Sequence, residues 1–259
     1  MTPMIFWAMS PAILIVVYFF LRDRFKEPPR IVIYTFILGV LSCIPIGFVN
    51  FYLDSYGYSL YTSQFAHDFY THMLRAAFHE ELYKFLILFY FCSRHTEFNE
   101  PMDAVVYGIA VSLGYAAYEN IGYVMAHEHF GYTWQYMAKI RVLPTIMHGT
   151  NGVIMGLLLS KVLFIHRNHT KLILALLIPV LFHGFYNLSI TYLPGISILL
   201  LIFFVVYMFT LVRRIRNLQA SKIMETEIKE VISHSIVFQS IFLTLAVVAI
   251  FVAIVVGMN

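Results

Sequence analysis

The sequence predicts an all-α, polytopic membrane protein with about eight transmembrane helices. Of its 259 residues, 60% are hydrophobic and 12% are charged, whereas soluble domains average about 25% charged residues. Several apolar runs approach the roughly 20 residues that cross a bilayer as a helix. Solid runs such as residues 196–212 lack the alternating pattern of a transmembrane β-barrel. Composition thus excludes a soluble globular domain and a disordered chain, and no basic patch suggests a nucleic-acid partner.

Hydropathy places the expected spans in order along the chain. Each is a mostly apolar run, and charged or turn-forming residues separate it from the next. The first run has no basic segment before it and no small-residue cleavage site, so we expect an uncleaved span. No repeat or soluble segment interrupts the pattern, which predicts one integral-membrane domain over residues 1–259. The expected spans are about 3–21, 31–53, 69–92, 102–126, 139–163, 172–192, 195–212 and 236–257.

Basic residues are confined to alternate loops. Thirteen of the seventeen Lys and Arg residues fall in the first, third, fifth and seventh connections, whereas the loops 54–68, 127–138 and 191–194 contain none. Because cytoplasmic loops collect Lys and Arg, we expect both termini on the outer side. Residues 213–235 mix charges with apolar residues at near-helical spacing, which predicts a cytoplasmic amphipathic helix on the inner leaflet.

Spans 3 to 6 carry ionisable side chains that a bilayer disfavours. A charge at the centre of a membrane helix costs roughly 2.5–3.5 kcal/mol, so such residues are functional candidates. In the third span, Glu80 and Glu81 both lie within one turn of Lys84. For single residues the alternative is simple pairing or polar packing between helices. The third span is also expected to carry one polar stripe at helical spacing, formed by Asp68, His72, Arg75 and His79.

Four of these residues are expected in one layer. Glu80, Glu119, His148 and His183 each lie about seven to ten residues from the outer end of their spans, which is roughly 10–15 Å at 1.5 Å per residue. Carboxylates and imidazoles in a low-dielectric pocket can activate water and donate a proton to a leaving group. A zinc ion held by Glu119, His148 and His183 is the alternative that stays open.

Four motifs, in order along the chain, resemble those of the PrsW family of intramembrane proteases. Tyr115 stands where that family often has Phe. Lys84 and Glu119 depart from the EExxxR and FxxxH motifs of the related CAAX prenyl endopeptidases and their bacterial relatives, which favours the PrsW branch. The four motifs are Glu80-Glu81-Leu82-Tyr83-Lys84, Tyr115 to Glu119-Asn120, the isolated His148, and His183 to Asn187.

The resemblance implies roles for these residues. Glu80 would be the general base on water and Glu119 its partner, while His183 and Asn187 would stabilise the oxyanion. Members of this family are described either as glutamic or as metal-dependent proteases, so zinc stays open as a cofactor. The remaining members of the implied site are Glu81 and His148, with Lys84, Asn120 and Arg141 in support.

The resemblance also implies a substrate and a place. We expect an endopeptidase of the bacterial cytoplasmic membrane that cuts a single-span membrane protein, such as an anti-sigma factor, near the outer face. Buried carboxylates and histidines also build proton relays, so an ion-coupled transporter is a second hypothesis. The absence of a repeated half in the sequence disfavours it. A third hypothesis is a non-catalytic protein that binds single-span partners.

Overall fold

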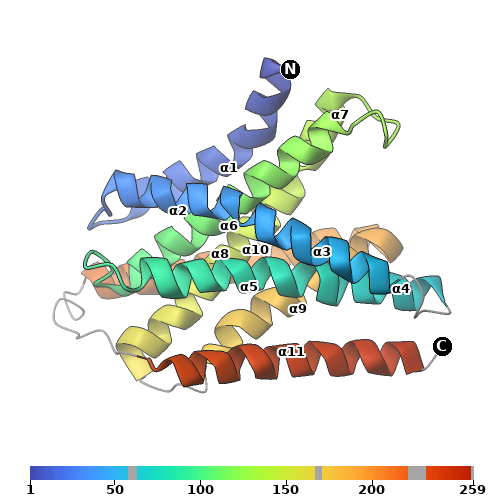
Figure 1. Cartoon of the computed structure of the whole chain (residues 1–259). Helices are drawn as coiled ribbons and strands as arrows, with labels where there is room; N and C mark the ends of the chain where they lie inside the picture. Colours follow the sequence, from blue (N-terminus) through green and yellow to red (C-terminus); the bar gives the residue numbers. More distant parts are fainter. Residues whose placement is uncertain (58–62, 167–170, 221–231, 258–259) are drawn as a thin grey trace.

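The computed structural model describes residues 1–57, 63–166, 171–220 and 232–257, and in these residues every regular element is a helix (Figure 1). Six helical stretches are long and apolar enough to cross a membrane, and they coincide with six of the expected spans. The protein is therefore an all-helical, polytopic membrane protein. The other two expected spans, 69–92 and 102–126, also form helices. They contain more polar side chains, so they do not belong to this apolar set.

The helices follow the expected spans in order. Three stretches have the wider π-helical geometry: η1 (Thr71–Phe78), η2 (Ile87–Cys92) and η3 (Lys161–His166). The α-helices are α1 (Thr2–Arg22), α2 (Pro29–Leu41), α3 (Cys43–Gly57), α4 (Gln64–Tyr70), α5 (His79–Leu86), α6 (Pro101–Met125), α7 (Trp134–Ile140), α8 (Val142–Ser160), α9 (Leu172–Tyr192), α10 (Pro194–Ala220) and α11 (His234–Gly257).

The expected amphipathic segment, residues 213–235, falls largely outside the described residues. Its first part, residues 213–220, continues α10, and residues 221–231 are not described. The amphipathic helix therefore stays a prediction.

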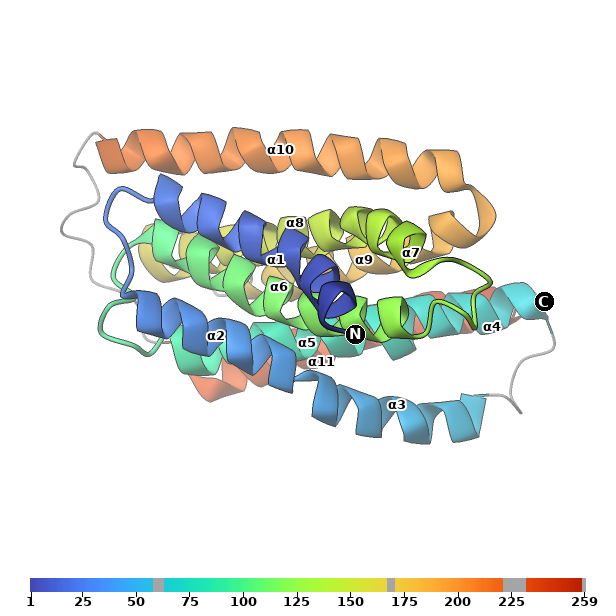
Figure 2. The ribbon, with the colours of Figure 1, turned by 90° about the horizontal axis from the view of Figure 1, so that it is seen from above.

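Helix α6 lies at the centre of the bundle and packs against α8, α2 and α1 (Figure 2). Glycines allow the backbones to touch, as small residues do in membrane helix pairs. A Cβ on Gly108 would collide with the backbone of Gly152 on α8, and a Cβ on Gly114 would collide with the backbone of Phe36 on α2. This close packing holds α6 in a fixed position relative to α2 and α8.

Helix α2 ends at Leu41, so the second expected span is not one continuous helix. Ser42 follows, and its hydroxyl donates to the carbonyl of Gly39 at 2.6 Å. Pro45 has no N–H with which to continue the helical bonding pattern across this point. The chain resumes as α3, which diverges from the bundle (Figure 2).

The single polar stripe expected in the third span is wrong. Segment η1 has more residues per turn than an α-helix, so side chains at α-helical spacing drift to different faces. His72 contacts Thr191 on α9, with Nε2 3.2 Å from the hydroxyl oxygen. Arg75 instead forms an ion pair with Asp54 on α3.

Candidate active site

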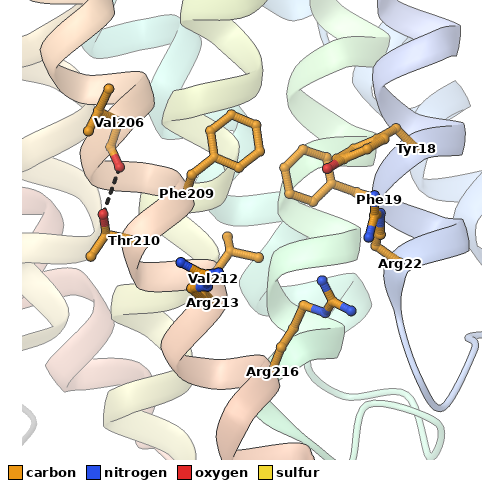
Figure 3. A pocket seen from close by; sticks show the side chains of 9 residues that line it. All are labelled: Tyr18, Phe19, Arg22, Val206, Phe209, Thr210, Val212, Arg213 and Arg216. Atoms are coloured by element: carbon orange, nitrogen blue, oxygen red, sulfur yellow. Dashed lines mark hydrogen bonds between the residues drawn. The ribbon is translucent and has the colours of Figure 1, made fainter.

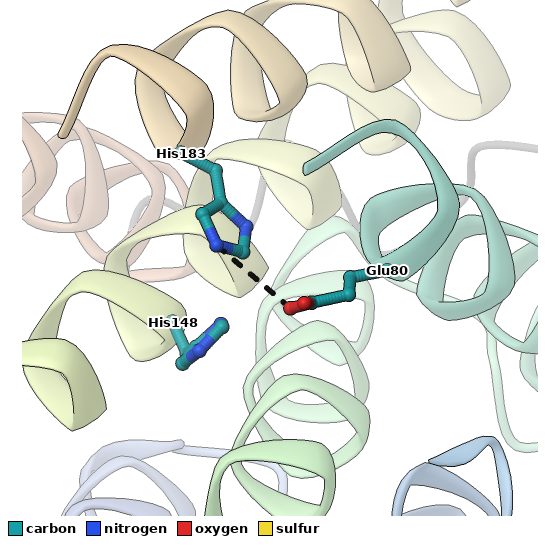
Figure 4. A group of neighbouring side chains, drawn as sticks. All are labelled: Glu80, His148 and His183. Carbon is teal, nitrogen blue, oxygen red and sulfur yellow. Dashed lines mark ion pairs between the residues drawn. The ribbon is translucent and has the colours of Figure 1, made fainter. Parts of the chain in front are cut away.

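A cluster of ionisable side chains lies inside the bundle, where three helices meet (Figure 4). Glu80 comes from α5, His148 from α8 and His183 from α9. They are 6%, 1% and 2% exposed. Gly152 lies one turn after His148 on α8, and its contact with α6 holds this part of α8 in place. The structure thus brings these three predicted residues together from distant parts of the sequence.

Lys84 connects two members of the cluster. Its Nζ lies 2.7 Å from Oε1 of Glu81 and 3.0 Å from Nδ1 of His148. An ammonium group has only donors, so Nδ1 of His148 accepts this hydrogen bond. The proton of neutral His148 is then on Nε2, which lies 3.2 Å from Oε2 of Glu119 and donates to it. Lys84 therefore selects the tautomer of His148.

Glu81 orients the second histidine. Its Oε1 also lies 2.9 Å from Nδ1 of His183, which donates to the carboxylate. The opposite ring nitrogen, Nε2, faces Oε2 of Glu80 at 3.8 Å. A carboxylate that holds one imidazole nitrogen fixes the direction of the other. Glu81 thus presents Nε2 of His183 to Glu80.

Arg141, between α7 and α8, holds Glu119 from the other side. Its Nη2 pairs with Oε2 of Glu119, and its Nε donates to the side-chain oxygen of Asn120 at 2.9 Å. Asn120 in turn donates to the hydroxyl of Thr145 at 2.8 Å and to the carbonyl of Ala8 at 3.2 Å. Arg141 therefore binds one side-chain oxygen of each residue, Oε2 of Glu119 and Oδ1 of Asn120.

Glu80 is held by fewer hydrogen bonds than Glu119 within the described residues. Its Oε2 is buried and has no hydrogen-bond partner within the described residues. Such an atom costs about 1–3 kcal/mol and marks a place where a ligand, a proton or a water belongs. One ligand atom each of Glu80, His148 and His183 lies within 4.8 Å of the other two. Two imidazoles and a carboxylate are a common catalytic zinc set, so these residues fit a metal ion.

The expected zinc set named Glu119 in place of Glu80, and the structure corrects this. Glu119 is already bound by Arg141 and His148, whereas Glu80 groups with the two histidines. His148 bonds through both ring nitrogens, to Lys84 and to Glu119, so it must give up one bond to act as a ligand. Spacing in the sequence could not separate the two glutamates, because both lie at the same expected depth.

Asn187 is not drawn into this network. It lies one turn after His183 on α9, is half-buried, and its side chain makes no hydrogen bond within the described residues. Its expected role stays a prediction.

Two contacts were missed by sequence reasoning. The ring of Tyr115 lies 4.6 Å from Nζ of Lys84, and α1 contributes the carbonyl of Ala8, for which no side-chain signal exists.

A second acidic group, also missed, lies where α1, α2 and α6 meet. Asp23, Glu27 and Asp103 each place one carboxylate oxygen within 4.8 Å of the others. The hydroxyl of Tyr107 donates to Glu27, and backbone N–H groups of Asn99 and Glu100 donate to Asp103. Burial raises the pKa of Glu27, with a smaller contribution from neighbouring carboxylates. The three residues come from a loop and a helix start, so no spacing in the sequence predicts them.

The helical membrane fold and this buried set of carboxylates and imidazoles fit a peptidase embedded in the membrane. Residues 27–212 match the family model described as PrsW family intramembrane metalloprotease. The chain belongs to the PrsW family and is an intramembrane protease, as the motifs predicted.

Curated relatives agree with this assignment. The chain is 36% identical to Protease PrsW of Bacillus subtilis (strain 168) over 188 residues, which cover 70% of this chain and 80% of the relative. It is 34% identical to Protease PrsW of Oceanobacillus iheyensis over 182 residues, covering 69% and 78%. Protease PrsW of Geobacillus kaustophilus is 33% identical over 180 residues, covering 69% and 75%. No solved structure matches the chain.

Proposed function

We propose that this protease cuts a peptide bond of a single-span membrane protein near the outer face of the bacterial cytoplasmic membrane. An anti-sigma factor is one such substrate. The observation that carries the proposal is the buried Oε2 of Glu80, which lacks a hydrogen-bond partner within the described residues and faces Nε2 of His183. A water between them would contact the carboxylate oxygen of Glu80 and the imidazole Nε2 of His183.

Glu80 acts as the general base. Its Oε2 is uncommitted, so it takes a proton from the attacking water and later passes it to the leaving amine. Glu119 cannot do this as readily, since Arg141 and His148 both occupy it. Glu119 instead holds His148, and through it the shape of the pocket.

His183 meets the oxyanion. Glu81 accepts from Nδ1 at 2.9 Å and so fixes the direction of Nε2. With a proton on Nε2, the ring donates to the developing oxyanion, and Asn187, one turn away, adds an amide donor. As a neutral imidazole, His183 instead offers the lone pair of Nε2 to a metal.

The family description includes a metal, and Glu80, His148 and His183 are the residues that would hold it. A zinc ion held there would supply Lewis-acid chemistry for activating water. In either case Glu81 and Lys84 orient the two histidines, and the surrounding helices exclude bulk water.

The proposal includes eight membrane spans with both termini outside. Helix α6 is buried along most of its length between α1, α2 and α8, so it must run beside these helices through the bilayer. The end of α1 and the starts of α2 and α11 lie at one end of the bundle, with the C-terminus at the other (Figure 1). Basic residues cluster at the former end, which supports a cytoplasmic position for it.

The experiment uses the full chain reconstituted in liposomes with a single-span probe protein. Mass spectrometry of the products gives the cleaved bond. We expect a cut in the outer half of the probe's apolar segment. Ion flux without cleavage would instead identify a transporter, and probe binding without cleavage would identify a non-catalytic binder.

A further inference from the structure

A cleft opens between α3 and α6 because the second span is broken. Up to Gly39, the backbones of α2 and α6 touch: a Cβ on Gly39 would collide with the carbonyl of Val111. Beyond Ser42 the chain turns away as α3, which contacts α6 much less than α2 does (Figure 2). The break at Ser42 and Pro45 therefore determines where the cleft begins.

The cleft has a volume of about 380 Å³ and reaches the candidate active site. At its inner end lie Tyr115, whose ring contacts Lys84 and His148, and Glu119, which accepts from His148. From there it follows α6 outward to Ala126 and Phe130. Under the proposed topology this is the outer half of the membrane.

Two glycines widen the cleft. Gly47 on α3 and Gly122 on α6 both line it, and a Cβ on either would meet no atom within 4 Å. This separates them from Gly39, Gly108 and Gly152, whose Cβ atoms would strike backbone. Helix packing therefore does not require Gly47 or Gly122, and their lack of side chains leaves room for something else.

The lining also offers hydrogen bonds. Asn50 on α3 has a buried Oδ1 with no hydrogen-bond partner within the described residues. An amide side chain can accept from a peptide N–H and donate to a peptide carbonyl. In a bilayer, an unwound peptide needs such partners, since lipid provides none. A lipid acyl chain would leave Asn50 unsatisfied. An intact helix would also leave it so, because the backbone groups of a helix already bond to one another.

We propose that the cleft between α3 and α6 binds the substrate as an extended, unwound segment of a single-span protein. Its backbone lies against Gly47 and Gly122, pairs with Asn50, and leads the scissile bond to Glu80. This assignment rests on the proposed protease function and adds the entry route and the conformation of the substrate.

Filling the cleft tests the route. The probe is a synthetic single-span peptide with a Gly-Pro break in its outer half, reconstituted with the full chain. We expect Gly122→Leu to lower kcat/KM at least about tenfold, mainly by raising KM, and Gly122→Ala to change it little. Gly195→Leu on α10 is the matched control, because its Cβ also meets nothing within 4 Å but lies outside the cleft.

Cys43 supplies a readout that does not need cleavage. It lines the cleft and is partly exposed, whereas the other cysteine, Cys92, is buried. We expect bound probe to slow alkylation of Cys43 by N-ethylmaleimide. Protection without cleavage would support the cleft and refute the protease proposal. Cleavage that neither Gly122→Leu nor alkylation of Cys43 slows would refute the cleft alone. Neither cleavage nor protection would refute both.

A different feature carries a second inference. A pocket of about 460 Å³ lies between α1 and α10, with Arg22, Arg213 and Arg216 around its mouth and Phe19 and Phe209 above them (Figure 3). Within the described residues none of these arginines forms an ion pair with a carboxylate. Three guanidinium groups around one pocket repel each other unless an anion lies between them.

We infer that this pocket binds an anionic phospholipid, with its phosphate at the arginines and an acyl chain against the phenylalanines. Bidentate guanidinium groups suit phosphate oxygens. We expect native mass spectrometry to show bound phosphatidylglycerol, lost at least about tenfold in Arg213→Gln/Arg216→Gln. The control, Lys26→Gln/Arg30→Gln, removes equal charge outside the pocket. Equal loss in the control, equal binding of phosphatidylcholine, or full displacement by inorganic phosphate would overturn the inference.

Discussion

Lys84 and Glu81 form an ion pair that is completely buried in the bundle. Their Nζ and Oε1 atoms are 2.7 Å apart, and both side chains are 0% exposed. Lys84 also donates to His148, and Glu81 accepts from His183. The pair therefore connects α5 to α8 and α9, and it sets the direction of both histidines.

Removing one partner of this pair should be costly. Lys84→Met leaves Glu81 buried without its cation, and breaking a buried pair on one side costs about 3–5 kcal/mol. We expect a lower thermal midpoint in detergent and reduced protease activity, because His148 loses the donor to its Nδ1. The measurement is thermal unfolding followed by intrinsic fluorescence.

The double variant Lys84→Met/Glu81→Leu provides the control. With both charges gone, the desolvation penalty disappears, so its midpoint should lie above that of Lys84→Met. A double variant less stable than either single one would show that the pair is not coupled in this way.

The helices and most of the cluster follow from the sequence. Long apolar runs form helices in a bilayer whatever their neighbours, so their order and approximate ends were predictable. Glu80, Glu81, Lys84, His148 and His183 were recognisable because a charge inside such a run needs a compensating partner. The partner itself was not visible, since the pairing of Lys84 with His148 depends on how α5 and α8 pack.

The rest depended on backbone geometry. The π-helical turn of η1 places His72 and Arg75 on different faces, and the spacing of apolar residues in the sequence does not indicate such a turn. The break at Ser42 opens a cleft inside what reads as one apolar run. The sequence also did not show that Glu80, and not Glu119, groups with the two histidines. Glu119 is bound by Arg141, which lies well separated from it along the chain.

Glu80→Gln should abolish cleavage and preserve the fold. Gln has the same shape but cannot accept a proton from water at neutral pH, and a general base contributes about 10²–10⁴-fold. Glu119→Gln should cost nearly as much, because it weakens the hold of Arg141 and His148 on the pocket. The measurement is cleavage of a reconstituted single-span probe, with the thermal midpoint as the folding control. Near-normal turnover by Glu80→Gln would refute its role as base.

Metal content should follow the three clustered residues. The metal-dependent form of the mechanism predicts about one zinc ion per chain after purification without chelator, as for other catalytic sites with two histidines and a carboxylate. His183→Ala should lose the ion, whereas Asn187→Ala should keep it, because Asn187 stands outside the group. Elemental analysis measures this directly. A chelated, metal-free protein that retains full activity would establish the glutamate mechanism without metal.

A reporter at either terminus should lie outside the cell. Thirteen of the seventeen Lys and Arg residues fall in the connections assigned to the cytoplasm, and loop charge sets orientation. Alkaline phosphatase fused after Asn259 should therefore be active, and a fusion of green fluorescent protein at the same place should be dark. The reverse pattern would contradict the eight-span topology and the depth of the site.

The last prediction concerns pH and the acidic group at the start of α6. Burial raises the pKa of Glu27, and Asp23 and Asp103 face it as further carboxylates while Tyr107 donates to it. The folded protein therefore holds the proton of Glu27 more tightly than the unfolded chain. Its stabilising contribution is full below the unfolded pKa of about 4.3 and is lost as pH rises through the raised pKa.

Glu27→Gln should remove this loss. The amide is neutral at every pH and still offers an oxygen to Tyr107, so we expect the variant to exceed the native protein by a few degrees in thermal midpoint at pH 7.5. At pH 4 the two should be nearly equal, because the native carboxyl is protonated there. Glu128→Gln, at an exposed loop position, is the control and should change little at either pH. A gain that is larger at pH 4 than at pH 7.5 would show that Glu27 is stabilised as the carboxylate, for example by a bound cation, since only a group favoured in its ionised form contributes more as pH rises.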